Sequence, residues 1–140
     1  MKTFNVVVGL SCLFLSFACA QPKHAETLPV SYKADSEIKF RFAESDVLSK
    51  YESVLEDDVT YLKNNPTKAV VIEGNTDVLG ENEYNLDLGD QRAKAVKAYF
   101  IEKGIEASRI ITITYGEEQP KKDANTTREN RRVVIRDMNK

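Results

Sequence analysis

Histidine and cysteine are scarce in this chain of 140 residues. His24 is the only histidine, which excludes a His-based catalytic triad, a His-based zinc site and a histidine proton shuttle from everything that follows it. The only two cysteines, Cys12 and Cys19, both lie near the N-terminus, so no disulfide can form within the rest of the chain. A domain formed by that remainder must be held by its core alone, and we expect it to need neither a metal nor a cofactor.

The chain also lacks an excess of basic charge. Lys2 is the only charged side chain in residues 1–18, so the remainder carries 19 basic and 22 acidic side chains and a net charge of −3. Nucleic-acid binding requires a dense basic face, so we exclude nucleic acid as a main partner. The local basic cluster "RRVVIR", residues 131–136, alternates as a strand does.

One apolar run stands at the N-terminus. Lys2 is followed by "FNVVVGLSCLFLSFA", residues 4–18, which ends in small residues. A charged start, an apolar centre and a small-residue end are typical of a secretory signal peptide, and the run is shorter than the ~20 residues of a membrane-spanning helix. The sequence therefore predicts an exported protein with a signal peptide over residues 1–18.

Two cleavage sites compete at the end of this run. "LSFAC" resembles the bacterial lipoprotein signal, in which Cys19 would receive lipid and become the mature N-terminus. In that case residues 19–36 are a lipidated N-terminus and a flexible tether, held to the bilayer by the lipid. Ala20, in place of Asp, then favours the outer membrane, with the domain in the periplasm. The alternative is the A-x-A site "ACA", residues 18–20, which would release a soluble periplasmic protein starting at Gln21.

The residues after the tether alternate between strand and helix patterns. "EIKFRF", residues 37–42, places Ile38, Phe40 and Phe42 on one face of a strand, and a helix is expected from Ser45 or Asp46 to the residues before Pro66. The other expected elements are a strand over 69–74, a helix over about 86–103 capped by Gly104, and strands over 109–116 and 130–136. This order predicts an α/β two-layer sandwich, βαβαβ-loop-β, with two main helices on a mixed four-stranded sheet, formed by one domain over 37–140.

The polar segment "EGNTDVLGENEYNLDLGDQRAKAV", residues 73–96, joins the second strand to the second helix. Ligands gather beyond the carboxyl ends of strands in α/β folds. Asp77 and Arg92 offer one charge of each sign there, which suits a zwitterion with an ammonium and a carboxylate. The alternatives are that Asp77 only braces its own turn, and that Arg92 is solvated or is a structural partner of Asp77.

Three motifs carry a family resemblance: "IEGNTDVLGENEYNLDLGDQRAKAVKAYFIEKGI", "RIITITYGEEQP" and "NRRVVI". Together they resemble the OmpA-like peptidoglycan-binding domain family over residues 37–136. The resemblance implies binding, without cleavage, of the diaminopimelate in the peptidoglycan stem peptide, and attachment of the outer membrane to the wall. The residues that match the family's binding residues are Asp77 and Arg92 for the two ends of diaminopimelate, with Thr76, Asn85, Arg131 and the aromatic Phe40 and Phe42 around them.

Some positions depart from the family pattern, and two rival functions remain. Asn75 stands where the family often has histidine, and Arg41 and Ala43 stand where the first strand usually carries acidic residues. One rival is a module that binds other periplasmic envelope proteins without binding the wall. The other is a peptidoglycan hydrolase that uses carboxylates among Glu73, Asp77, Glu81 and Glu83.

Overall fold

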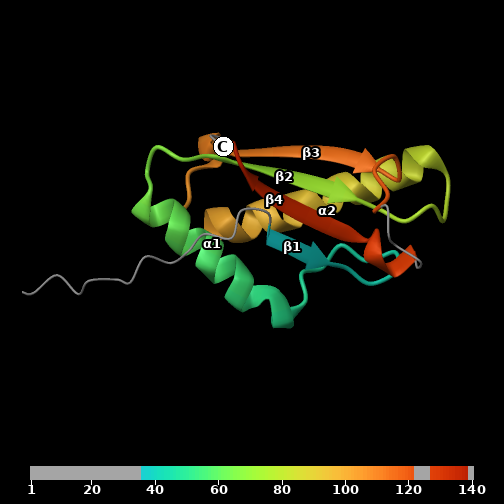
Figure 1. The fold of residues 1–140 in the computed structure, drawn as a ribbon, viewed down its shortest axis with the longest axis horizontal. Helices are drawn as coiled ribbons and strands as arrows, with labels where there is room; N and C mark the ends of the chain where they lie inside the picture. Colours follow the sequence, from blue (N-terminus) through green and yellow to red (C-terminus); the bar gives the residue numbers. More distant parts are fainter. Residues whose placement is uncertain (1–35, 122–126, 139–140) are drawn as a thin grey trace, which may run out of the picture.

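The helices and strands follow the order that the sequence predicts. A computed structural model describes residues 36–121 and 127–138, so the predicted signal peptide, Cys19 and the tether lie outside the described residues (Figure 1). The elements are β1 Ser36–Lys39, η1 Ser49–Tyr51, α1 Glu52–Asn64, β2 Val70–Asn75, α2 Asn82–Glu102, η2 Ala107–Arg109, β3 Ile110–Gly116, η3 Thr127–Glu129 and β4 Arg132–Asp137.

The four strands form one mixed sheet in the order β1-β4-β2-β3. β2 and β3 run parallel, while β4 is antiparallel to both of its neighbours, β1 and β2. The last strand of the chain is therefore an inner strand, and the first strand lies at one edge. This arrangement confirms the predicted α/β fold, with a mixed four-stranded sheet and two main helices.

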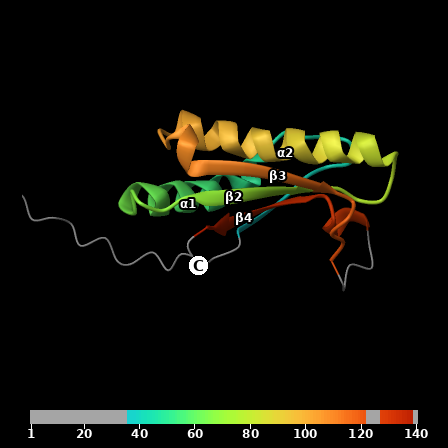
Figure 2. The ribbon, with the colours of Figure 1, turned by 90° about the horizontal axis from the view of Figure 1, so that it is seen from above.

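One face of the sheet carries the core. Ile72 of β2 pairs with Ile135 of β4, and both are fully buried with Leu55 of α1 and Phe100 of α2. Because side chains alternate along a strand, the neighbouring residues of β2 and β4 face the other side of the sheet. Both helices therefore cover the same face, as the two perpendicular views show (Figures 1 and 2). None of the described helices combines the length and apolar character needed to cross a membrane.

The first strand is shorter than predicted. β1 ends at Lys39, although the backbone N–H of Phe40 still donates to the carbonyl of Arg131 at 2.9 Å. Ala43 then takes a left-handed φ of 55°, which turns the chain away from the sheet. Phe42 is consequently 59% exposed, so the prediction that it shares the inner face with Ile38 and Phe40 was wrong.

The helix starts also differ from the prediction. Leu48 is extended, with ψ 137°, so α1 begins only at Glu52, after η1, and neither Ser45 nor Asp46 caps it. α2 begins at Asn82, four residues before the expected Leu86. The predicted glycine cap at the end of α2 is confirmed. Gly104 has φ 90° and donates its N–H to the carbonyl of Ile101, which satisfies an acceptor of the last turn.

Two glycines let α2 lie against β2. A Cβ placed on Gly74 would stand 1.9 Å from the carbonyl oxygen of Gly89, and one on Gly89 would stand 2.4 Å from Oγ1 of Thr114. Only residues without a Cβ allow this approach of helix and strand. Gly89 lies three residues before Arg92 on the same face of α2, so the contact brings Arg92 close to the end of β2.

Candidate functional site

Asp77 lies buried in the turn that follows β2. The N–H of Thr76 donates to the carbonyl of Gly116 at 2.8 Å, which continues the pairing with β3 past a register shift at Gly74 and Asn75. Asp77 is then 4% exposed, and its Oδ1 accepts the N–H of Leu79 at 3.3 Å. That bond braces the turn, and the other carboxylate oxygen remains for a charged partner.

The charged partner of Asp77 in the structure is Arg131. Nη1 of Arg131 donates to Oδ2 of Asp77 at 2.9 Å, and the side chains are 14% and 5% exposed. The two residues meet because β4 is antiparallel to β2, with Arg132 opposite Asn75. Arg131, predicted as a residue near the rim, is thus in direct contact with the central carboxylate.

Arg92 is fully buried, with 0% of its surface exposed. Its three nitrogens each donate to a backbone carbonyl: Nη1 to Asn75 at 3.0 Å, Nη2 to Arg41 at 3.0 Å and Nε to Glu44 at 2.9 Å. The guanidinium therefore joins the end of β2 to the segment after β1. The alternative of a solvated helix arginine is excluded by this burial.

Arg92 keeps its positive charge at neutral pH. Burial lowers its pKa to about 10, while the nearby Asp77 carboxylate raises the pKa and Arg131 lowers it. The guanidinium carbon also lies 5.2 Å from the centre of the Phe40 ring, a cation–π contact. Asp77, Arg92 and Arg131 together carry one negative and two positive charges, so this junction has an excess positive charge that favours a carboxylate.

Three buried oxygens at the same junction have no hydrogen-bond partner among the described residues: Oδ1 of Asn75, Oγ1 of Thr76 and Oδ1 of Asn85. Nδ2 of Asn85 donates to Oε2 of Glu117 at 2.6 Å. The unpaired Oδ1 of Asn85 faces Gly80, where an added Cβ would stand 3.6 Å from this oxygen. Buried polar atoms are normally paired, so these oxygens are candidates to accept a hydrogen bond from a ligand donor such as an ammonium.

A cleft of about 580 Å³ adjoins this junction. Phe40 and Arg131 form part of its wall, while Asp77 and Arg92 lie behind them. The residues that line it are Lys39, Phe40, Arg41, Phe42, Leu48, Ser49, Lys50, Arg128 and Arg131. The structure thus brings Phe40, Thr76, Asp77, Arg92 and Arg131 to one end of the sheet, with Asn85 at the start of α2. Sequence reasoning missed Lys50, Arg128 and Glu117. Glu117 lies within the motif "RIITITYGEEQP" and Arg128 two residues before "NRRVVI", but no spacing or periodicity distinguishes them from other charged residues.

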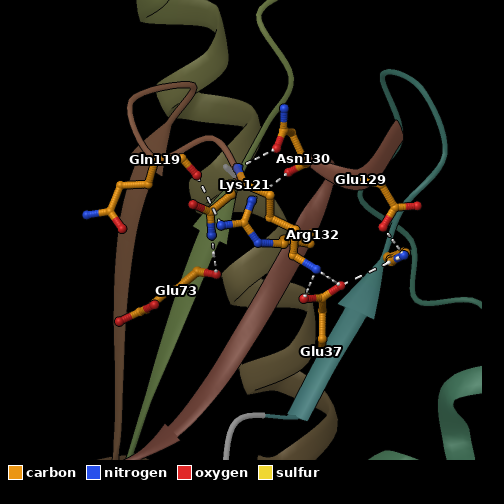
Figure 3. A network of polar contacts seen from close by, with 9 residues as sticks. Glu37, Glu73, Gln119, Lys121, Glu129, Asn130 and Arg132 are labelled. Carbon is orange, nitrogen blue, oxygen red and sulfur yellow. Dashed lines mark hydrogen bonds and ion pairs between the residues drawn. The ribbon is translucent and has the colours of Figure 1, made fainter. Parts of the chain in front are cut away.

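The segment before β4 is fixed by a polar network on the open face of the sheet (Figure 3). Nζ of Lys121 lies 2.7 Å from Oε2 of Glu37, and Lys39 pairs with Glu129. Arg132 donates to the carbonyl of Gln119 at 3.0 Å. These contacts tie both sides of the loop between β3 and β4 to the sheet, which places Arg131 against Asp77.

The four carboxylates considered for a hydrolase have separate surroundings. Glu73 pairs with Nε of Arg136 at 3.0 Å, and Asp77 pairs with Arg131. Glu81 and Glu83 are exposed at the start of α2. Within residues 36–121 and 127–138, no group of three histidine, cysteine or acidic side chains is arranged to hold a metal ion.

The comparisons with known proteins agree with the fold. The OmpA family matches residues 39–133. The peptidoglycan-associated lipoprotein of Haemophilus influenzae is 40% identical over 101 residues, which cover 70% of this chain and 66% of the relative. That of Pseudomonas putida is 38% identical over 100 residues, 69% of this chain and 60% of the relative. The chain therefore spans about two thirds of the length of these relatives.

Solved structures of related proteins have the same fold. The crystal structure of the peptidoglycan-associated lipoprotein from Burkholderia pseudomallei has a TM-score of 0.69 and 31% sequence identity, and the match covers 73% of this chain and 89% of that one. The cell wall anchor of the T6SS from Pseudomonas aeruginosa, at 21% identity and a TM-score of 0.59, shares the fold. The span matched by the family holds both helices and every predicted binding residue from Phe40 to Arg131, and the chain therefore belongs to the OmpA family.

Proposed function

We propose that this domain binds the diaminopimelate of peptidoglycan stem peptides without cleaving it. With Cys19 lipidated, the protein would attach the outer membrane to the cell wall from the periplasmic side. The names of the relatives, peptidoglycan-associated lipoproteins, support this function. The observation that carries it is the buried charge cluster of Asp77, Arg92 and Arg131 beside unpaired oxygen atoms.

The cluster suits an amine and a carboxylate borne on one carbon. A guanidinium has five N–H groups, and the three bonds of Arg92 to carbonyls leave two of them for a carboxylate. The ammonium would lie against the Asp77 carboxylate and the free oxygens of Thr76 and Asn85. Each end of the zwitterion would thus receive charge-assisted bonds in a site that excludes most water.

Binding without catalysis accords with the state of the acidic groups. The carboxylate of Asp77 is engaged by Arg131, and that of Glu73 by Arg136, so neither is placed as a free acid or base for glycoside cleavage. Incubation with sacculi should release no muropeptides, and their release would establish the hydrolase alternative.

The experiment is co-sedimentation with diaminopimelate-type sacculi. Asp77→Asn keeps the shape and the bond to Leu79 but removes the charge, and we expect a tenfold to hundredfold loss of affinity, from about 1.5–3 kcal/mol for a charge-assisted bond. Arg92→Lys should lose binding as well. Because Arg92 also holds three backbone carbonyls, the thermal unfolding of this variant must be measured in parallel. Glu81→Gln, an equal charge change on the exposed part of the same turn, is the matched control and should bind as the wild type does.

If Asp77→Asn sediments with sacculi to the same extent as the wild type, the proposed site is refuted. Peptidoglycan with lysine in place of diaminopimelate lacks the second carboxylate, and it should therefore bind weakly to the wild type. Equal binding of the two types would show that the zwitterion is not what the domain recognises.

A further inference from the structure

The cleft beside the charge cluster is lined by cations and by no acidic side chain. Five of its residues are basic: Lys39, Arg41, Lys50, Arg128 and Arg131. The whole chain has a formal net charge of −2, so this concentration of positive charge is local and is not a general property of the surface. A concave surface lined by one sign of charge concentrates ligands of the opposite sign.

Two of these cations, Lys50 and Arg128, form no ion pair with a residue that the structure describes, although Arg128 is near enough to Glu129 to help lower the pKa of that carboxyl. Lys39 pairs with Glu129, and Arg131 pairs with Asp77. Arg41 lies 3.6 Å from Glu44 in an exposed contact of the kind that contributes little. Lys50 only lies over the Tyr51 ring, with 4.8 Å from Nζ to the ring centre, and Arg128 makes no ion pair with a described residue.

The cleft shares its wall with the proposed diaminopimelate site. Arg131 lines the cleft and donates to Asp77, and Phe40 lines it and contacts the Arg92 guanidinium. Arg92 also holds the carbonyl of Arg41, the next residue of the wall. A peptide anchored at Asp77 and Arg92 that passes Phe40 and Arg131 would therefore meet the cationic surface.

Phe42 supplies an apolar part of the same wall. Its side chain is 59% exposed because the left-handed Ala43 turns the chain out of β1, so the ring contributes little to the core. An exposed aromatic ring beside cations suits a ligand with both methylene groups and carboxylates, such as an acidic peptide.

We propose that the cleft is a second subsite, which binds another carboxylate of the same stem peptide through Lys50 and Arg128. This inference rests on the proposed function, since the peptide must be anchored at Asp77 and Arg92. The acidic residue before diaminopimelate in the stem is linked through its side chain, which leaves its α-carboxylate free. The glutamate is joined to the end of diaminopimelate opposite the anchored amine and carboxylate, and the link runs through the glutamate side chain. Its α-carboxylate therefore lies several bonds beyond the anchored group, where the adjoining cleft can receive it.

The test measures the affinity of the domain for two soluble peptides by calorimetric titration. Both contain diaminopimelate preceded by a side-chain-linked glutamate, with a free α-carboxylate in one and an α-amide in the other. The wild type should bind the free acid about tenfold more tightly, in accord with modest pairs at an open surface. In the double variant Lys50→Gln/Arg128→Gln this ratio should fall to about one.

The matched control is Lys63→Gln/Lys94→Gln, which removes two charges from exposed sites on α1 and α2 outside the cleft and should keep the wild-type ratio. A wild-type ratio of one, or an unchanged ratio in the cleft variant, would overturn the subsite. A ratio that falls equally in the control would overturn it too, because net charge alone would then explain the preference. Asp77→Asn should weaken both peptides. If it weakens neither, the proposed function itself fails, and this result is distinct from a failure of the subsite.

Discussion

Asp58 offers a test of the packing around α1. It is 3% exposed among core residues of α1, its Oδ1 accepts the hydroxyl of Ser36 in β1 at 2.8 Å, and its Oδ2 has no partner among the described residues. Burial raises the pKa of this carboxyl from 3.8 to about 6; the Ser36 bond opposes the rise and the neighbouring Asp57 adds to it. The folded state therefore holds the proton more tightly than the unfolded chain.

The sign and size of the effect follow from this difference. Below pH 3.8 both states are protonated and Asp58 has no effect on the pH dependence of stability. As the pH rises from 3.8 to about 6, the unfolded chain ionises first, so the free energy of unfolding falls, and above that range the loss is constant. A shift of roughly two pKa units amounts to about 3 kcal/mol, of which about 2 kcal/mol falls between pH 4 and pH 7.

Asp58→Asn removes this titration and keeps an oxygen for Ser36. The free energy of unfolding can be measured by urea unfolding at a series of pH values. The difference between the variant and the wild type, variant minus wild type, should rise by about 2 kcal/mol between pH 4 and pH 7. Asp57→Asn, at the exposed neighbouring position, should follow the wild-type curve closely. Parallel curves for Asp58→Asn and the wild type would refute the raised pKa and the packing from which it follows.

Two further changes test the fold and the anchor. Gly74→Ala places a methyl group against the Gly89 carbonyl, and calorimetry should show a loss of about 3 kcal/mol or more in the free energy of unfolding. Gly104→Ala, at φ 90° with open space around it, should lose only about 1 kcal/mol. Equal losses in the two variants would contradict the close contact of α2 with β2. Cys19→Ser should move the protein from the detergent phase to the soluble fraction if Cys19 carries lipid, and a soluble wild-type protein that begins at Gln21 in mass spectra would show cleavage at the A-x-A site instead.

The order of elements could be predicted because it depends on local periodicity. The β-branched run in "AVVIEG" and the helical spacing of Val96 and Phe100 are properties of short windows, and the structure buries Val70, Ile72, Val96 and Phe100. The end of β1 depends instead on distant contacts. Arg92 holds the carbonyls of Arg41 and Glu44, and this tertiary contact accompanies the turn that leaves Phe42 exposed. No local pattern carries that information.

The residues of the proposed site could be named from the sequence, but their contacts could not. Spacing and resemblance indicated Asp77, Arg92 and Arg131, yet they did not indicate that Asp77 pairs with Arg131. That pair requires the register of β4 against β2, with Arg132 opposite Asn75. The burial of Arg92 was also unpredictable, because the three carbonyls that it binds come from two other segments of the chain, the one after β1 and the end of β2.

The central place of β4 has a consequence for how the protein folds. Among the described strands β1 pairs only with β4, and Ser36 lies opposite Ile135, so the edge strand cannot join this sheet until nearly the whole domain has been synthesised. β2, α2 and β3 form a local unit that can collapse early, whereas closing a loop of this length costs entropy before any contact repays it. Asp77 and Arg92 belong to the early unit, while Phe40 and Arg131 arrive with β1 and β4. Before β4 pairs, the proposed binding surface therefore lacks Phe40 and Arg131, and a nascent chain without β4 has only half of it.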